Sequence, residues 1–180
     1  LSTGSPDAGL TVGPWGLIGG WSPLSTAATM NSAKGVALLL ESGASPSLGL
    51  GVGPLGAVVS NSPLYYAATK GYTEVVKELC KAGADLNAGW AIGRGFVIFG
   101  TPLFFAAKHG RDGAVQVLLE AGADTMMGLS MGPGGILGRQ TPLEVALSNN
   151  RHKAAKAIQD FLNPTSAPEK NGADKGAGEL

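Results

Sequence analysis

Few side chains in this sequence could support catalysis or metal binding. The chain contains two histidines, His109 and His152, and one cysteine, Cys80. General-base catalysis needs a nucleophile and an orienting acid near the histidine. The pattern around His109 supplies neither, and its neighbours Lys108 and Arg111 are basic. A single cysteine also excludes a cysteine-rich zinc site. We therefore expect no catalytic residue, no metal site and no cofactor, and we predict that the protein is not an enzyme.

One glycine motif deserves comparison with nucleotide-binding loops. The segment Gly51–Gly56 has the spacing Gly-x-Gly-x-x-Gly. A dinucleotide-binding loop with this spacing follows a strand and opens a long helix. Here the segment contains Pro54 and belongs to a glycine-rich stretch that recurs elsewhere in the chain. We interpret it as part of a turn rather than as a phosphate-binding site.

Composition narrows the possible functions further. The 180 residues include 13 basic and 13 acidic side chains, so the net charge is zero. A neutral chain lacks the positive potential that attracts nucleic acid, and we expect no nucleic-acid partner. The sequence has no apolar run of the roughly 20 residues that a membrane-spanning helix needs. Hydrophobic residues make up 44% of the chain, which is enough for a folded core.

Internal repetition is the strongest pattern in the sequence. The triplet Ser/Thr-Pro-Leu recurs at steps of 40, 39 and 40 residues, beginning at Ser22, Ser62, Thr101 and Thr141. The pair Gly-Ala follows 21 residues after each of the first three, at Gly43, Gly83 and Gly122. The constant spacing predicts a series of equivalent structural units.

Each unit is predicted to form two short helices. Serine or threonine suits the N-cap and proline the first helical position. The second helix is marked by apolar residues at helical spacing, such as Val75, Val76 and Leu79, and should end at the Gly-Ala pair. The first helix should end at residues that favour a left-handed turn, at Asn31, Gly71, Gly110 and Asn150.

These units resemble the ankyrin repeat, most closely in the segment SPLYYAATKGYTEVVKELCKAGADLNA, residues 62–88. The resemblance covers about residues 22–162. It implies a mostly α fold, an ankyrin-repeat solenoid of paired short helices with long β-hairpin fingers between repeats. Units in the family usually have about 33 residues, whereas these have 39–40. The family's histidine after Pro-Leu is also replaced, by Ser25, Tyr65, Phe104 and Glu144, so its hydrogen bonds must be made otherwise or lost.

The surplus residues fall in the predicted hairpins. Similar glycine-rich segments begin at Gly9, Gly49, Gly89 and Gly128, and an apolar pair follows each. Apolar residues two apart lie on one face of a strand, and Gly-Pro suits a tight turn. We therefore predict four elongated apolar fingers that form a low-charge sheet along one edge of the array. Their inward side chains are expected to cover one another, and their tips to contact a partner.

Fingertip residues form the first group of candidate partner-binding residues. Trp15, Leu55 and Phe96 are placed at predicted tips, and Trp90 lies in the same finger as Phe96. Large apolar side chains at hairpin tips are unusual unless something covers them. We therefore predict that these four residues contact a protein partner.

Adjacent aromatic residues form the second group. Tyr65-Tyr66 and Phe104-Phe105 follow Pro-Leu in the two central units, and one residue of each pair is expected to face inward. The resemblance implies that Tyr66 and Phe105 face the concave groove of the array. Aromatic side chains are favoured contact residues because they lose little rotamer entropy. The alternative is that they pack between the fingers and the helices.

The predicted array covers residues 1–163, with repeats at about 9–48, 49–88, 89–127 and 128–163. Residues 164–180 are small, polar and charged, and we expect a flexible tail there. Residues 1–60 contain three charged side chains, Asp7, Lys34 and Glu41. Because a terminal repeat normally needs a polar outer face, we expect the N-terminal end to dock against a partner or to follow further repeats.

The leading functional hypothesis is a non-catalytic protein–protein interaction module that acts as a scaffold in a stable complex. A more specific hypothesis is a linker or assembly subunit on a membrane protein complex. Such a subunit would lie in an organelle such as the plastid after transit-peptide removal, and otherwise in the cytoplasm. The alternative is binding of a small molecule or pigment between the fingers, where Trp15, Trp21 and Trp90 could stack on flat rings.

Overall fold

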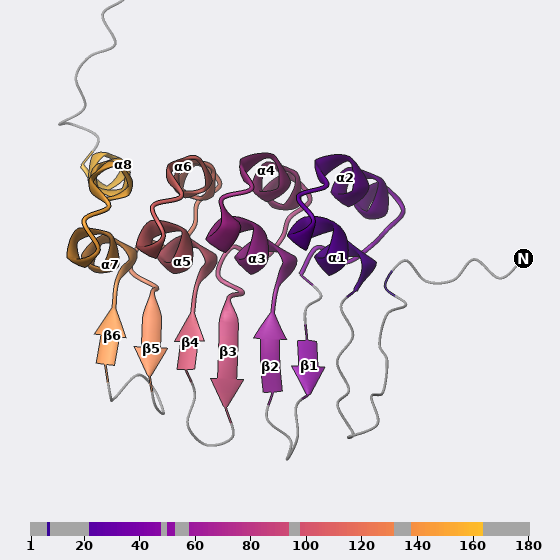
Figure 1. Ribbon diagram of the computed structural model, residues 1–180, viewed down its shortest axis with the longest axis horizontal. Coiled ribbons are helices and arrows are strands. Elements are labelled where there is room, and N and C mark those ends of the chain that lie inside the picture. The colour runs from indigo at the N-terminus through magenta and orange to yellow at the C-terminus, as the bar shows by residue number, and fades with distance from the viewer. Residues whose placement is uncertain are drawn as a thin grey trace, which may run out of the picture.

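The computed structural model describes residues 7, 22–47, 50–52, 58–93, 98–131 and 138–163. These residues form eight helices and six strands (Figure 1). The helices are α1 (Pro23–Thr29), α2 (Ala33–Glu41), α3 (Pro63–Lys70), α4 (Thr73–Lys81), α5 (Pro102–Lys108), α6 (Asp112–Glu120), α7 (Pro142–Ser148) and α8 (His152–Leu162). The strands are β1 (Leu50–Val52), β2 (Val58–Asn61), β3 (Trp90–Gly93), β4 (Ile98–Gly100), β5 (Leu129–Met131) and β6 (Gly138–Gln140).

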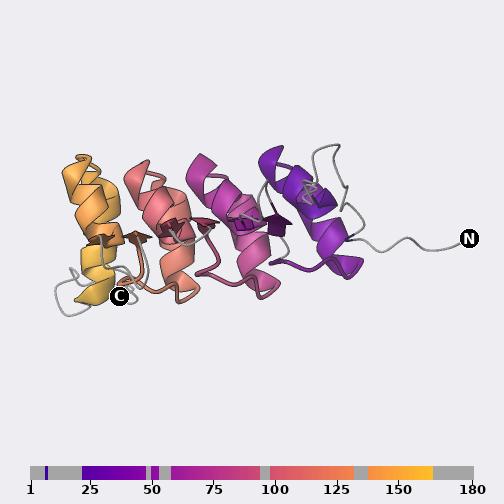
Figure 2. The ribbon, with the colours of Figure 1, turned by 90° about the horizontal axis from the view of Figure 1, so that it is seen from below.

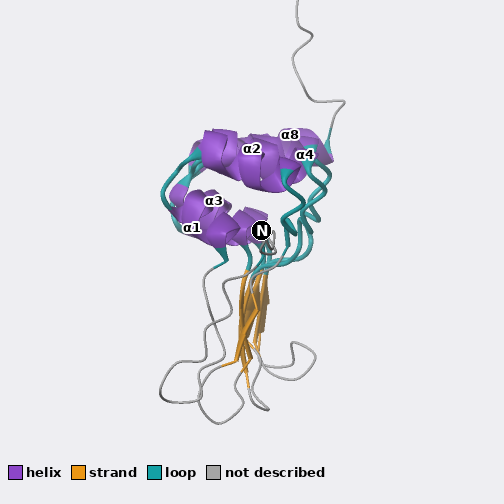
Figure 3. Ribbon diagram, turned by 90° about the vertical axis from the view of Figure 1, so that its right-hand side faces the viewer, coloured by secondary structure: helices purple, strands orange, loops and turns teal. Residues whose placement is uncertain are grey.

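Four helix pairs stand side by side in a single row (Figure 2). The first helices of the pairs, α1, α3, α5 and α7, lie nearer the strands, and the second helices form a row beyond them (Figure 1). Each first helix contacts the first helix of the next unit. In side view the strands extend away from the helices, and the first helices project to one side of the sheet (Figure 3). The array is therefore a helical repeat solenoid with a small sheet along one edge.

The six strands form one antiparallel sheet in the order β1 to β6. Neighbouring strand pairs join each other, since Val59 of β2 lies opposite Ile92 of β3 and Phe99 of β4 lies opposite Ser130 of β5. The prediction that successive hairpins pair edge to edge is thus confirmed for the described strands. The predicted tips and the first finger lie outside the described residues, so the full length of the fingers stays a prediction.

Local sequence explains where the helices begin and end. The Ser62 and Thr101 side chains accept hydrogen bonds from the backbone N–H groups of Tyr65 and Phe104, which caps α3 and α5. The turn residue after each first helix has positive φ, as predicted: 56° at Asn31, 80° at Gly71, 63° at Gly110 and 56° at Asn150. Glycine and asparagine tolerate this left-handed backbone better than other residues do.

The same capping hydroxyls also bond to the segment that ends their own unit and leads into the next one. Ser62 Oγ donates to the carbonyl oxygen of Ala88, and Thr101 Oγ1 donates to that of Met127 at 2.9 Å. Both acceptors lie just before the next unit's first strand. These bonds hold the end of each unit, just before the next unit's first strand, against the start of its own first helix.

A second set of hydrogen bonds recurs along the array. In each bond a side-chain oxygen accepts from a backbone N–H about one repeat later. The Ser45 N–H donates to the Asp7 carboxylate at 3.0 Å, and the Asp85 N–H donates to the Ser47 hydroxyl oxygen at 2.9 Å. Such side-chain bonds satisfy loop N–H groups that have no partner in a helix or sheet.

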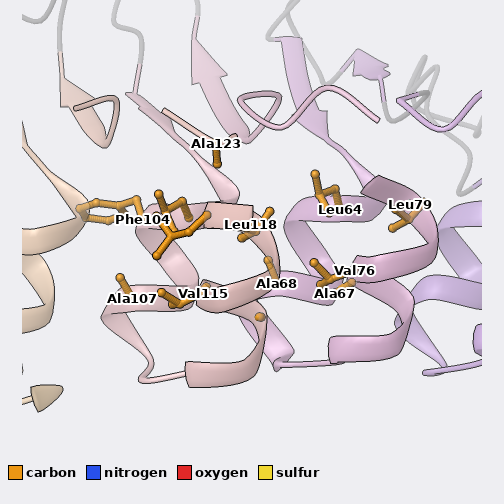
Figure 4. Packing of buried hydrophobic residues seen from close by; sticks show 14 of the residues in the cluster. Leu64, Ala67, Ala68, Val76, Leu79, Phe104, Ala107, Val115, Leu118 and Ala123 are labelled. Carbon is orange, nitrogen blue, oxygen red and sulfur yellow. The ribbon is translucent and has the colours of Figure 1, made fainter. Parts of the chain in front are cut away.

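The core lies between the two helix rows and between successive units. It consists mainly of alanine, valine and leucine, and Figure 4 shows the part between α3 and α6. Leu64, Val76, Leu79 and Leu118 have no exposed surface. Small alanines at the helix contacts allow the close approach of neighbouring units.

Two glycines are required where neighbouring strands meet the helices. A Cβ atom on Gly89 would lie 1.6 Å from the carbonyl oxygen of Gly100, and one on Gly128 would lie 2.0 Å from that of Gln140. No side chain fits at these distances. These contacts give a physical reason for glycine at the start of the repeated strand segments.

Candidate functional site

Four aromatic rings form a continuous strip across the two central units. We name Tyr65 and Tyr66 of α3 and Phe104 and Phe105 of α5 the aromatic strip. Ring centroids are 5.3 Å apart for Tyr65–Tyr66, 5.0 Å for Tyr65–Phe105 and 5.2 Å for Phe104–Phe105. The interplanar angles of 69°, 90° and 85° make each contact edge-to-face, a favourable geometry for aromatic pairs. The Tyr65–Phe105 contact joins one unit to the next.

The rings of the strip differ in exposure. Phe104 is 1% exposed and belongs to the core, where its ring projects from α5 (Figure 4). Phe105, Tyr65 and Tyr66 are each half-buried. The prediction that one residue of each pair faces inward is confirmed for the phenylalanines, whereas both tyrosines keep part of their surface accessible. Half-buried aromatic groups of this kind combine a fixed position with an available contact surface.

The sheet holds Phe105 in place. A Cβ atom on Gly100, the last residue of β4, would lie 2.5 Å from Cε2 of Phe105, so the ring covers that glycine closely. The strip therefore reaches the corner between the first helices and the sheet (Figure 3). This contact supports the packing interpretation for one side of Phe105 and leaves its remaining surface accessible.

The strip is electrically neutral but has a cation beside it. Burial raises the pKa of Tyr65 and of Tyr66 above the usual range, and the neighbouring Tyr65 raises that of Tyr66 further, so both phenols stay protonated at neutral pH. The Nζ atom of Lys108 lies 5.9 Å from the centroid of Phe105. This distance falls within the range of a cation–π interaction.

Four basic residues border the strip at the turns between first and second helices. We name Lys70, Lys108, Arg111 and Arg151 the basic rim; all four are exposed. Arg111 Nε donates to the Thr69 carbonyl oxygen at 3.2 Å, and Arg151 Nε donates to that of Lys108 at 3.3 Å. Each guanidinium group thus caps the first helix of the preceding unit, where a positive charge is favourable.

The basic rim cannot be recognised within a single repeat, because its contacts join residues of successive units. A usable signal was present, since Arg111 follows Gly71 by 40 residues and Arg151 follows Gly110 by 41, which is one repeat length plus one residue in each case. In the structure a Cβ atom on either glycine would lie 2.8 Å from the arginine Cδ one unit later. The paired spacing of glycine and arginine therefore identifies the contact.

The fingertip residues predicted to bind a partner have a different outcome. Trp15, Leu55 and Phe96 lie outside the described residues, so their role stays a prediction. Trp90 is the first residue of β3, where it is paired with Gly100 and Asn61. Its backbone is therefore at the base of a strand pair, near the helices, and its partner-binding role also stays a prediction.

The residues considered for chemistry do not converge on a reactive site. Cys80 is half-buried, and burial raises the pKa of its thiol to about 11, which keeps it protonated and unreactive at neutral pH. Burial lowers the pKa of His109 below its usual range, and Lys108, Arg111, Arg151 and Lys70 lower it further. In the described part of the chain, no three His, Cys, Asp or Glu side chains come together as a possible metal site.

One further observation concerns membranes. Within the described ranges, the structure contains no helix with the length and apolar character needed to cross a bilayer.

Comparison with known protein families agrees with the observed architecture. The family model described as ankyrin repeats (three copies) matches residues 18–89 and, in an overlapping second match, residues 50–128. The two matches together span more than half of the chain and include α1 to α6. A search of curated proteins finds no match to this chain. The repeated helix pairs, their left-handed turns and the family match lead to one conclusion: the chain belongs to the ankyrin repeat family.

Proposed function

We propose that this protein is a non-catalytic interaction module that binds a protein partner through the aromatic strip. Ankyrin repeats generally act as protein–protein interaction modules. The observation that carries the proposal for this chain is the edge-to-face contact of half-buried rings across two successive units, beside the sheet. Pre-positioned aromatic rings lose little freedom on binding, so they favour high affinity.

The apolar strand segments supply a second contact region in this proposal. Fingertips at Trp15, Leu55 and Phe96, with Trp90 below them, would extend the surface from the corner along the sheet. An interface of this composition suits a permanent partner, because permanent interfaces are more apolar than transient ones. The low charge of the chain, 14% of residues, supports assignment to a stable assembly. A linker or assembly subunit on a membrane protein complex is the specific form that we propose.

Isolation of the native assembly in mild detergent tests the proposal that the protein works in a stable complex. We expect the chain to co-migrate with a defined protein at fixed stoichiometry, and with membrane proteins if the linker role is correct. Recovery as a free protein would contradict the stable complex. Visible absorbance that stays with the isolated chain would favour the alternative, a pigment held between the fingers.

A triple substitution tests the fingertip contribution separately. We expect Trp15→Ser, Leu55→Ser and Phe96→Ser together to weaken association with the co-purified partner while the far-ultraviolet circular dichroism stays helical. The matched control is Leu162→Ser at the exposed end of α8, far along the chain from the fingers. Unchanged affinity of the triple variant would remove the fingertips from the proposed interface.

A further inference from the structure

The basic rim contains four positive charges, two of which, on Arg111 and Arg151, are held in place by hydrogen bonds. The described residues contain a single ion pair, Lys81–Glu78 at 2.8 Å, so none of their carboxylates lies within ion-pair distance of the rim. The arginines of the rim are held in place by the carbonyl oxygens of Thr69 and Lys108 and by packing on Gly71 and Gly110. Held charges of this kind lose little side-chain entropy when they bind an anionic group.

All four charges of the basic rim act on His109. His109, which lies between them at the end of α5, has a lowered pKa because of burial first and then because of all four rim residues. Burial alone lowers a histidine pKa, but the further lowering by four cations shows that their charges act together at this position. The chain as a whole is neutral, so this potential is a local property of the turn edge.

The rim and the aromatic strip form one continuous surface. Lys108 contacts the Phe105 ring at 5.9 Å, and Lys70 follows Tyr66 by four residues on the same helix face. A ligand that covered the strip would therefore meet the rim at the helix C-termini. The same ligand would need apolar groups over the rings and negative groups beyond them.

We infer that the segment bound here is an acidic peptide stretch of the partner, with apolar side chains on Tyr65, Tyr66 and Phe105 and carboxylates on the basic rim. This inference rests on the proposed function and names the chemistry of the partner. A nucleic acid is a poorer fit, since its bases need parallel ring faces for stacking. The strip instead has successive rings tilted by 69° to 90°.

Fluorescence anisotropy with defined probes tests the inference on the full chain. The main probe is a labelled peptide of glutamate and leucine, and its charge-reversed partner contains lysine in place of glutamate. A labelled oligouridine and phosphatidylserine vesicles represent the other anionic classes. We expect the acidic peptide to bind best of the four, and its affinity to fall as salt screens the charges.

Lysine substitutions in the rim give the decisive comparison. We expect Lys70→Gln with Lys108→Gln to weaken binding of the acidic peptide on the order of tenfold. The control, Lys77→Gln, removes one charge from an exposed position of α4 outside the rim and should leave affinity unchanged. Thermal unfolding of each variant checks that the fold is intact.

Different results separate this inference from the proposed function. Equal binding of both peptides, tighter binding of oligouridine or vesicles, or an unchanged affinity of the Lys70→Gln/Lys108→Gln variant would overturn the acidic-segment inference. If the Tyr66→Ala/Phe105→Ala variant still bound the native partner more weakly than the wild-type chain, the proposed function would stand. If neither pair of substitutions changed the affinity for the native partner, both the acidic-segment inference and the proposed function would fail.

Discussion

The central and terminal units of this array share one backbone but present different side chains. The two positions after Pro-Leu are aromatic in both central units, whereas they are Ser25-Thr26 in the first unit and Glu144-Val145 in the fourth. Caps, turns and helix lengths are nearly the same in all four. The repeated residues therefore build the frame, and the residues that vary between units locate the candidate binding surface.

Burial differs between these units for a related reason. Leu79 has no exposed surface, whereas Leu39, its equivalent in the first unit, is half-buried. Ala107 is fully buried, whereas Leu147, its equivalent in the fourth unit, is 49% exposed. In a solenoid each unit is covered by its neighbours on both sides, and the two central units have a described unit on each side.

Alanine substitution of the equivalent residues Leu79 and Leu39 should produce the largest difference in the free energy of unfolding. Leu79→Ala leaves a cavity between buried helices, and we expect it to lower the free energy of unfolding by about 3 kcal/mol. Leu39→Ala removes a side chain that is already partly hydrated, and we expect a loss of about 1 kcal/mol. Urea denaturation followed by circular dichroism measures both. Equal losses would show that the first unit is covered as fully as the central ones.

Valine at two capping threonines probes the bond from a capping hydroxyl to the end of its own unit. Thr101 both caps α5 and donates to the Met127 carbonyl oxygen, while Thr141 forms a capping box with Glu144 at the start of α7. We expect Thr101→Val to cost about 2 kcal/mol and Thr141→Val about 1 kcal/mol. Thermal unfolding of the two variants gives the ranking. A larger loss at Thr141 would contradict the view that the additional bond of Thr101 to the end of its unit adds to stability.

The smallest expected effect is the contribution of His109 to the pH dependence of stability, which tests whether positive charge is concentrated at the basic rim. Its pKa in the folded chain lies below the ordinary 6.5, so the unfolded chain takes up the proton first. Stability therefore falls as pH decreases from 6.5 toward the lower folded value. Proton NMR should show the low pKa, and Lys70→Gln with Lys108→Gln should raise it part of the way, because burial still acts. No change in the pKa would argue against a concentrated positive potential at the rim.

Much of the fold could be predicted because its signals are local. Proline after Ser62 or Thr101 marks a helix start, and Gly71 or Asn31 marks a left-handed turn, whatever the rest of the chain does. The repeat spacing then places equivalent elements side by side. The edge-to-edge joining of strand pairs followed from the same spacing.

The candidate site was only partly predictable because its contacts cross between units. Tyr65 and Phe105 are 40 residues apart, and their ring contact depends on the distance and rotation between successive helices. The packing of Arg111 on Gly71 and its hydrogen bond to Thr69 depend on the same distance and rotation. The sequence identified Tyr66 and Phe105 as candidate partner-binding residues, but it did not show that the Tyr65 ring contacts both of them.

The central claim is that the aromatic strip binds the protein partner, and one titration tests it most directly. The purified partner would be titrated by calorimetry with the wild-type chain, with the Tyr66→Ala/Phe105→Ala variant, and with Thr26→Ala, the matched control at the same position in the first unit. We predict a loss of about 1–2 kcal/mol of binding free energy for each aromatic residue removed and none for Thr26→Ala. Unchanged affinity of the aromatic variant, or a loss explained by an equal loss of folding stability, would contradict the claim.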